Sequence, residues 1–169
     1  MSRIRSWASG SKLRIGLLVL IALFIVIQLV PYGHDHSNPG VTRAAAFDSP
    51  KTEQLVDGAC GDCHSNLTSW PIESNVAPMS WLIQNDVQGG REHLNFSEWD
   101  HPQPELGELT EKIQEGEMPP LQYRLLHPDA RLSDSEKAAL VAGLTKTYQQ
   151  DPPGGGTAAS TQDGDSDDD

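Results

Sequence analysis

The sequence predicts an all-α fold, in which a small helical domain over residues 49–149 follows a single N-terminal transmembrane helix over residues 15–32. Three observations carry this prediction. One uncharged apolar run lies near the N-terminus, later segments repeat apolar residues at helical spacing, and no segment alternates as a half-buried strand would. A domain of this size lies near the lower limit for a self-sufficient apolar core, so a large bound cofactor would help it to fold.

The N-terminal region has the charge pattern of a membrane anchor. Residues 1–14 contain four basic residues and no acidic one, and no charged residue follows until Asp35. This asymmetry predicts that residues 1–14 are cytoplasmic, that residues 15–32 span the membrane, and that the domain lies in the periplasm or another extracytoplasmic space. The alternative is a cleaved signal peptide, but the nearest small-residue cleavage site, Ala44-Ala45-Ala46, lies well beyond the apolar run.

Two further segments read as irregular. Residues 33–48 are rich in Gly, Pro, His, Asn and Ser, which predicts a linker between membrane and domain. Residues 150–169 begin with prolines and glycines and end in DGDSDDD, which predicts a disordered acidic tail. The net charge of −12 argues against a nucleic-acid partner, because phosphate binding needs clustered Lys and Arg.

Local signals mark the ends of the helices inside the domain. Ser49-Pro50 begins a short helix that leads into Cys60, and Gly89-Gly90 would end a helix over residues 78–87. A third helix over residues 105–115 ends before a glycine. The last helix has the clearest start, because Ser133 and the glutamate three residues later match a capping box.

The motif Cys60-Gly61-Asp62-Cys63-His64 predicts covalent attachment of one haem c. Two thiols three positions apart can reach both vinyl groups on one edge of a porphyrin, and His64 then comes under the iron as its axial ligand. A thioredoxin-type pair would need a βαβ context. A zinc site would need two ligands besides the cysteines, and His93 and His101 do not have finger-like spacing. A structural disulfide fits poorly with a three-residue separation on a helix.

Met118 is the expected second iron ligand. It lies in the phrase GEMPP, after one predicted helix and before the last, and the prolines would stiffen the loop that presents its sulfur. A Met ligand raises the reduction potential of a haem. Core packing of Met118, ligation by His93, His101 or His127, and an open sixth position remain alternatives.

Two long runs carry a family resemblance. GACGDCHSNLTSWPIESNVAPMSWLIQNDVQGGREHLNFSEW and EKIQEGEMPPLQYRLLHPDARLSDSEKAALVAGL resemble the haem-binding-domain family of small exported bacterial proteins, which are CxxCH-bearing relatives of class I cytochrome c. The resemblance covers residues 51–148. It implies a cytochrome c-like domain around one haem, with Cys60, Cys63, His64 and Met118 as attachment and axial residues.

Other residues fall in the same phrases, and each would line the haem pocket or, as the simpler expectation for most, pack in the core. They are Trp70, Trp81, Asn95, Phe96, Trp99 and Tyr123. Arg91 would pair with a haem propionate or stay on the surface. Ile72-Glu73 departs from the aromatic residues expected after Trp70-Pro71, which predicts a more open or more polar pocket edge.

The resulting functional hypothesis is one-electron transfer by a membrane-anchored monohaem c-type cytochrome. Its acidic surface would favour redox partners with a basic docking face. An enzyme such as a peroxidase is the first alternative, but it would need an open iron site and a distal acid–base pair. The second alternative is a haem-bearing sensor or accessory subunit of a membrane complex. An electron carrier is favoured over an enzyme.

Overall fold

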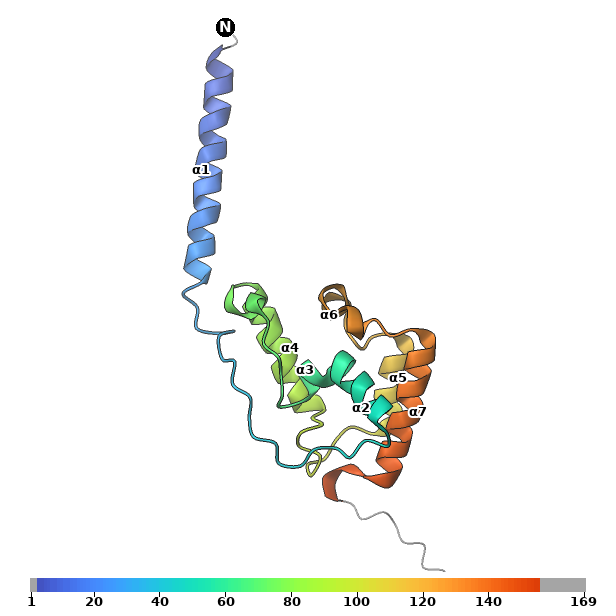
Figure 1. The fold of residues 1–169 in the computed structure, drawn as a ribbon. Helices are drawn as coiled ribbons and strands as arrows, with labels where there is room; N and C mark the ends of the chain where they lie inside the picture. Colours follow the sequence, from blue (N-terminus) through green and yellow to red (C-terminus); the bar gives the residue numbers. More distant parts are fainter. Residues whose placement is uncertain (1–2, 156–169) are drawn as a thin grey trace, which may run out of the picture. The chain divides into compact units, whose positions relative to one another are not determined.

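The computed structural model describes residues 3–155, which form helices joined by loops, with a single isolated bridge between Arg43 and Glu98 and no strand (Figure 1). The predicted all-α fold is confirmed. The chain divides into two compact units. One contains the residues up to Ser37 together with Trp70–Asp86, and the other contains Asn38–Ser69 together with the chain from Val87 onwards.

The first unit begins with helix α1, Arg3–Ile27. The apolar side chains between Ile15 and Val26 are between 47% and 66% exposed. The helix ends earlier than residue 32, the predicted end of the span, and the next side chain, Gln28, pairs with the backbone of Ala77 through two hydrogen bonds of 2.9 and 3.0 Å. Among the described residues, no helix combines the length and the apolarity needed to cross a membrane.

The second unit opens its helical part with α2, Pro50–Val56, whose cap is the predicted Ser49. The Ser49 hydroxyl accepts a hydrogen bond from the Thr52 N–H at 3.3 Å. The backbone then continues as a short π-helical stretch, η1 (Asp57–Gly61), and as α3 (Asp62–His64). The helix predicted to lead into Cys60 is therefore confirmed, and it carries the whole motif.

Helix α4, Met79–His93, corrects the prediction that a helix ends at Gly89-Gly90. The helix runs through both glycines, because Gly90 serves close packing and not termination. A Cβ atom at Gly90 would collide with the carbonyl oxygen of Cys63. Val87 on this helix is buried, whereas Met79 is 37% exposed.

The C-terminal half confirms both remaining helix predictions and adds a short helix. Helix α5 ends at Gly116, whose φ of +75° is the left-handed conformation that favours glycine. The capping box at Ser133 is formed, with the Ser133 side chain and the Glu136 side chain each bonded to the other's backbone N–H. The elements are α5 (Leu106–Glu115), α6 (Leu121–Leu126), η3 (Pro128–Ala130), α7 (Asp134–Gln150) and η4 (Pro153–Gly155).

The apolar core of the second unit is centred on Trp99, which is fully buried. Its ring stacks on Phe96 at 5.7 Å and meets Tyr148 edge-on at 5.1 Å between ring centroids. Such aromatic pairs stabilise a core beyond their buried area. The other buried members are Ala45, Leu55, Val56, Leu94, Ile113, Leu140 and Leu144.

Both segments predicted to be irregular extend into this folded unit. The Ala45 N–H donates to the Phe96 carbonyl at 2.9 Å, and the Trp99 N–H donates to the Arg43 carbonyl at 2.8 Å. The predicted linker is therefore folded over its second half. Asp151 pairs with Arg43 and accepts from the Ala46 N–H, so the boundary predicted at residue 150 lies too early. The rest of the predicted acidic tail, residues 156–169, lies outside the described residues.

Candidate haem-binding site

The two cysteines lie on one continuous stretch of helical backbone. Cys60 is in η1 and Cys63 is in α3, and Gly61 and Asp62 between them have ordinary right-handed helical φ and ψ angles. Residues three apart on a helix share a face, so the two side chains leave the helix on the same side. Both are partly buried thiols, and no disulfide joins them. This is the arrangement that two thioether bonds to one porphyrin edge require.

Burial controls the protonation of Cys60. Its pKa is raised from 9.0 to about 12, first by burial and then by repulsion from Cys63 and Asp57. Both causes disfavour the thiolate. Cys60 is therefore a protonated thiol at neutral pH, with little tendency to react as a nucleophile before a haem is bound.

Hydrogen bonds fix the His64 ring through one of its two nitrogens, Nδ1. Its Nδ1 lies 3.0 Å from the carbonyl oxygens of both Gly90 and Leu94. Both partners are acceptors only, so Nδ1 carries the proton and Nε2 keeps its lone pair. Histidines that ligate metals are oriented in this way, by a hydrogen bond from the other ring nitrogen. The pKa of His64 is lowered, because burial outweighs the two hydrogen bonds, which by themselves would raise the pKa. The neutral form of the ring, which can ligate a metal, is therefore favoured.

The loop after His64 is held by Arg91. The Arg91 Nε donates to the Ser65 carbonyl at 2.8 Å, and its Nη2 donates to Thr68 Oγ1 at 2.7 Å. The His64 carbonyl itself accepts from the Phe96 N–H at 2.8 Å. Arg91 therefore stabilises the polypeptide beside His64 and is half-buried, whereas the sequence favoured a simple surface position. A contact between Arg91 and a haem propionate stays a prediction.

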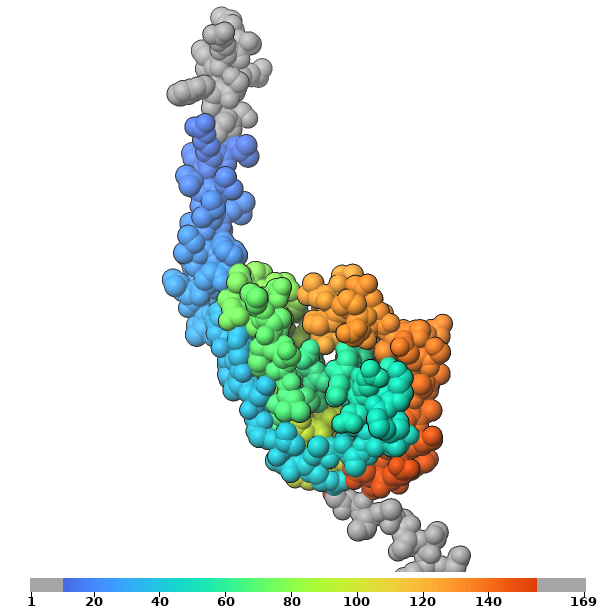
Figure 2. Space-filling model, viewed as in Figure 1, coloured from blue at the N-terminus to red at the C-terminus, as the bar shows by residue number. Residues whose placement is uncertain are grey.

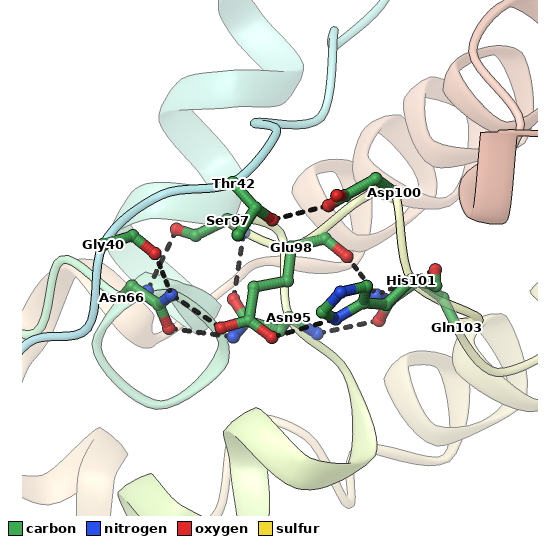
Figure 3. Close-up of polar contacts among 9 residues, drawn as sticks. All are labelled: Gly40, Thr42, Asn66, Asn95, Ser97, Glu98, Asp100, His101 and Gln103. Carbon is green, nitrogen blue, oxygen red and sulfur yellow. Dashed lines mark hydrogen bonds and ion pairs between the residues drawn. The ribbon is translucent and has the colours of Figure 1, made fainter.

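A buried network of amides continues this support (Figure 3). Asn66 is buried, and its Nδ2 donates to the Gly40 carbonyl at 3.0 Å and to Glu98 Oε1 at 2.9 Å. Its Oδ1 accepts from Asn95 Nδ2 at 2.8 Å, and its backbone N–H donates to Ser97 Oγ at 3.0 Å. Every polar group of the Asn66 side chain is thus satisfied, which fixes the loop. Asn95 is part of this support, as Phe96 and Trp99 are part of the core.

Met118 follows α5 and lines a cavity. Its N–H donates to the Lys112 carbonyl at 3.1 Å, the peptide bond after it is cis, and its side chain is 38% exposed. The cavity has a volume of about 360 Å³ and includes Arg124, whose buried Nε has no hydrogen-bond partner among the described residues. A buried donor without a partner is costly, and a haem carries two carboxylates that can satisfy one.

The segment after Met118 reaches the cysteine motif through Tyr123. The Tyr123 hydroxyl donates to Asp62 Oδ2 at 2.7 Å, and Figure 2 shows the surface of α6, in orange, next to that of residues 57–64, in teal. The pKa of Tyr123 is raised, first by burial and then by its bond to Asp62. This contact was not predicted, because nothing in the sequence relates the middle of the motif to the tyrosine.

The three histidines weighed as alternative iron ligands each have another partner. His93 Nε2 lies 3.2 Å from Glu108 Oε1, and His101 Nδ1 lies 3.2 Å from Glu98 Oε2. The His127 ring stacks on Tyr123 at 3.9 Å between centroids, and its Nδ1 lies 3.1 Å from the Tyr123 carbonyl.

The remaining residues singled out by the resemblance lie in the first unit. Trp70 stacks on His36 at 4.8 Å between ring centroids. The buried Nε1 of Trp81 has no hydrogen-bond partner among the described residues. Ile72, which stands where aromatic residues were expected, is 85% exposed.

A helical domain with two neighbouring free thiols and an oriented histidine is compatible with a small helical haem protein. The chain belongs to the haem-binding domain family, whose model matches residues 22–146, more than half of the chain. Comparison with curated proteins and with solved structures gave no match. The family membership and the donor set agree, so the residues present fit a haem.

Proposed function

We propose that the protein is a membrane-anchored monohaem c-type cytochrome that transfers single electrons outside the cytoplasmic membrane. Cys60 and Cys63 would hold the haem through thioether bonds, and His64 and Met118 would ligate the iron. When bound, the haem supplies the one-electron chemistry, and the protein supplies ligation, burial and orientation. The observation that carries the proposal is the pair of hydrogen bonds at Nδ1, which leaves the lone pair of His64 Nε2 available to ligate a metal.

The choice of Met118 as the sixth ligand rests on two observations. Met118 presents a partly exposed thioether in a cavity, whereas His93 Nε2 is already paired with Glu108 Oε1. A thioether favours ferrous iron and raises the reduction potential, as an electron carrier accepting electrons from a membrane complex would need. If Met118 ligates the iron, no open position would remain, which would argue against a peroxidase.

Membrane anchoring and partner choice are proposed from the distribution of charge. Residues 15–32 carry no charge and follow a basic segment, and the apolar side chains of α1 that the structure describes are exposed. All acidic residues come after this segment and give the chain a net charge of −12. An acidic surface favours a redox partner with a basic docking face, and such docking weakens as salt increases.

The decisive experiment is the intact mass of the full chain after denaturation, purified from a host that exports and matures c-type cytochromes. We expect a mass increased by one haem. A Cys60→Ala/Cys63→Ala double variant from the same host is the matched control and should show no added mass. Unmodified wild-type chain, beside a control cytochrome that does mature, would remove the proposed function.

A further inference from the structure

Tyr123 connects the segment that carries Met118 with the helix that carries the two cysteines. It lies in α6, Leu121–Leu126, which follows Met118 after only two prolines. Its hydroxyl donates to Asp62 Oδ2 at 2.7 Å, and Asp62 stands between the two cysteines. One hydrogen bond thus joins the two stretches that would supply the opposite faces of a haem.

The acceptor of this bond is fixed on its other side. Asp62 Oδ1 accepts from the Ser69 N–H at 2.9 Å, and the Asp62 carbonyl accepts from Thr68 Oγ1 at 2.6 Å. The carboxylate therefore cannot rotate freely. A hydrogen bond to an ionised carboxylate is stronger than a neutral one, so this contact restrains α6 more than an ordinary surface bond would.

The donor is fixed as well. The Tyr123 ring stacks on His127, and the Tyr123 carbonyl accepts from His127 Nδ1 at 3.1 Å. The raised pKa of Tyr123 keeps its hydroxyl protonated over the whole range in which the protein would work. The phenol is thus a permanent donor on a ring held in one orientation.

We propose that Tyr123 is a positioning residue for the sixth iron ligand, and that its hydrogen bond to Asp62 keeps the Met118 thioether on the iron. This inference rests on the proposed function. A bound thioether is in equilibrium with a state in which the loop has moved away. A contact made only while the loop is in place lowers the population of that second state.

The test is displacement of the thioether by imidazole in the ferric, haem-loaded full chain. Apparent imidazole affinity increases in proportion to the fraction of molecules with an open iron. Tyr123→Phe keeps the stacked ring and loses only the hydroxyl. We expect it to bind imidazole about tenfold more tightly than wild type, the size expected for loss of one hydrogen bond to a charged group. Its reduction potential should fall as well, because the thioether favours ferrous iron.

Tyr148→Phe is the matched control. Its hydroxyl also makes one hydrogen bond, to the Pro104 carbonyl at 3.1 Å, but Tyr148 lies on α7, away from the Met118 loop. This variant should bind imidazole as wild type does. Asp62→Asn keeps an acceptor oxygen and should show a smaller increase than Tyr123→Phe.

The outcomes separate the two proposals. If the wild-type protein carries haem but lacks the long-wavelength band of thioether-ligated ferric haem, Met118 ligation fails and this inference fails with it. If that band is present and Tyr123→Phe behaves as Tyr148→Phe does, the proposed function stands and the positioning role of Tyr123 is wrong.

Discussion

Gly89 and Gly90 provide a test of how α4 supports His64. The two glycines are neighbours on one helix, but their surroundings differ. A Cβ atom at Gly89 would meet nothing within 4 Å, whereas one at Gly90 would collide with the carbonyl oxygen of Cys63. The Gly90 carbonyl also accepts the hydrogen bond from His64 Nδ1. We therefore expect Gly89→Ala to stabilise the protein and Gly90→Ala to destabilise it.

The expected magnitudes follow from opposing effects. Replacing a helical glycine by alanine favours the helix by about 1 kcal/mol at either position. At Gly90 the added methyl group meets backbone, which cannot move aside as a flexible side chain would, and overpacking of this kind costs roughly 1–3 kcal/mol. A weakened His64 bond would cost about 1 kcal/mol more. The two variants should therefore differ by roughly 1–4 kcal/mol in the free energy of unfolding, with Gly90→Ala the less stable.

The measurement is urea unfolding of the haem-loaded full chain, monitored by circular dichroism. The reduction potential of each variant is measured as well. Only Gly90→Ala should change the potential, because only that substitution moves the carbonyl that orients His64. Unfolding free energies that agree within about 0.5 kcal/mol, close to the error of such comparisons, would refute the reasoning. They would mean that α4 does not contact the cysteine motif as closely as described.

Three further predictions concern the cap, the buried network and pH. Ser133→Ala should lower the free energy of unfolding by about 1 kcal/mol in urea melts, and Ser135→Ala should lower it by less, because only Ser133 caps α7. Asn66→Ala should cost more, roughly 2–3 kcal/mol in the same assay, because it leaves buried partners of the amide unsatisfied. The third prediction concerns the chain produced without haem. The pKa of His64 is lowered from 6.5 in the folded state, so as pH decreases through this value the unfolded state takes up a proton before the folded state does. Stability should therefore fall as pH decreases through this range, and His64→Gln should lack that component of the urea-midpoint profile.

Elements with local signals were predicted well from the sequence. Ser49 and Ser133 cap helices, and Gly116 ends one, because each acts on backbone groups within a turn of itself. The role of the Gly89-Gly90 pair could not be predicted in the same way. A glycine that ends a helix and a glycine that admits a distant carbonyl look alike in sequence, and only the fold brings Cys63 to Gly90.

The predicted linker shows a second limit. Its composition is that of a tether, yet its second half bonds to residues 96–99 almost entirely through backbone groups. Backbone hydrogen bonds place little demand on side-chain type, so composition does not reveal them. The cysteine motif and Met118 could be singled out because their chemistry resides in the side chains themselves.

His64 is supported by residues far from the cysteine motif in the sequence. The ring is oriented by two carbonyls at the end of α4, and the His64 backbone is held by the N–H of Phe96. Phe96 is in turn fixed by its stacking on the buried ring of Trp99. Phe96 and Trp99, for which core packing was the simpler expectation, therefore support His64 through the backbone that they immobilise. If His64 ligates the iron as proposed, these contacts would hold its ring in place when the charge on the iron changes, as electron transfer with little rearrangement requires.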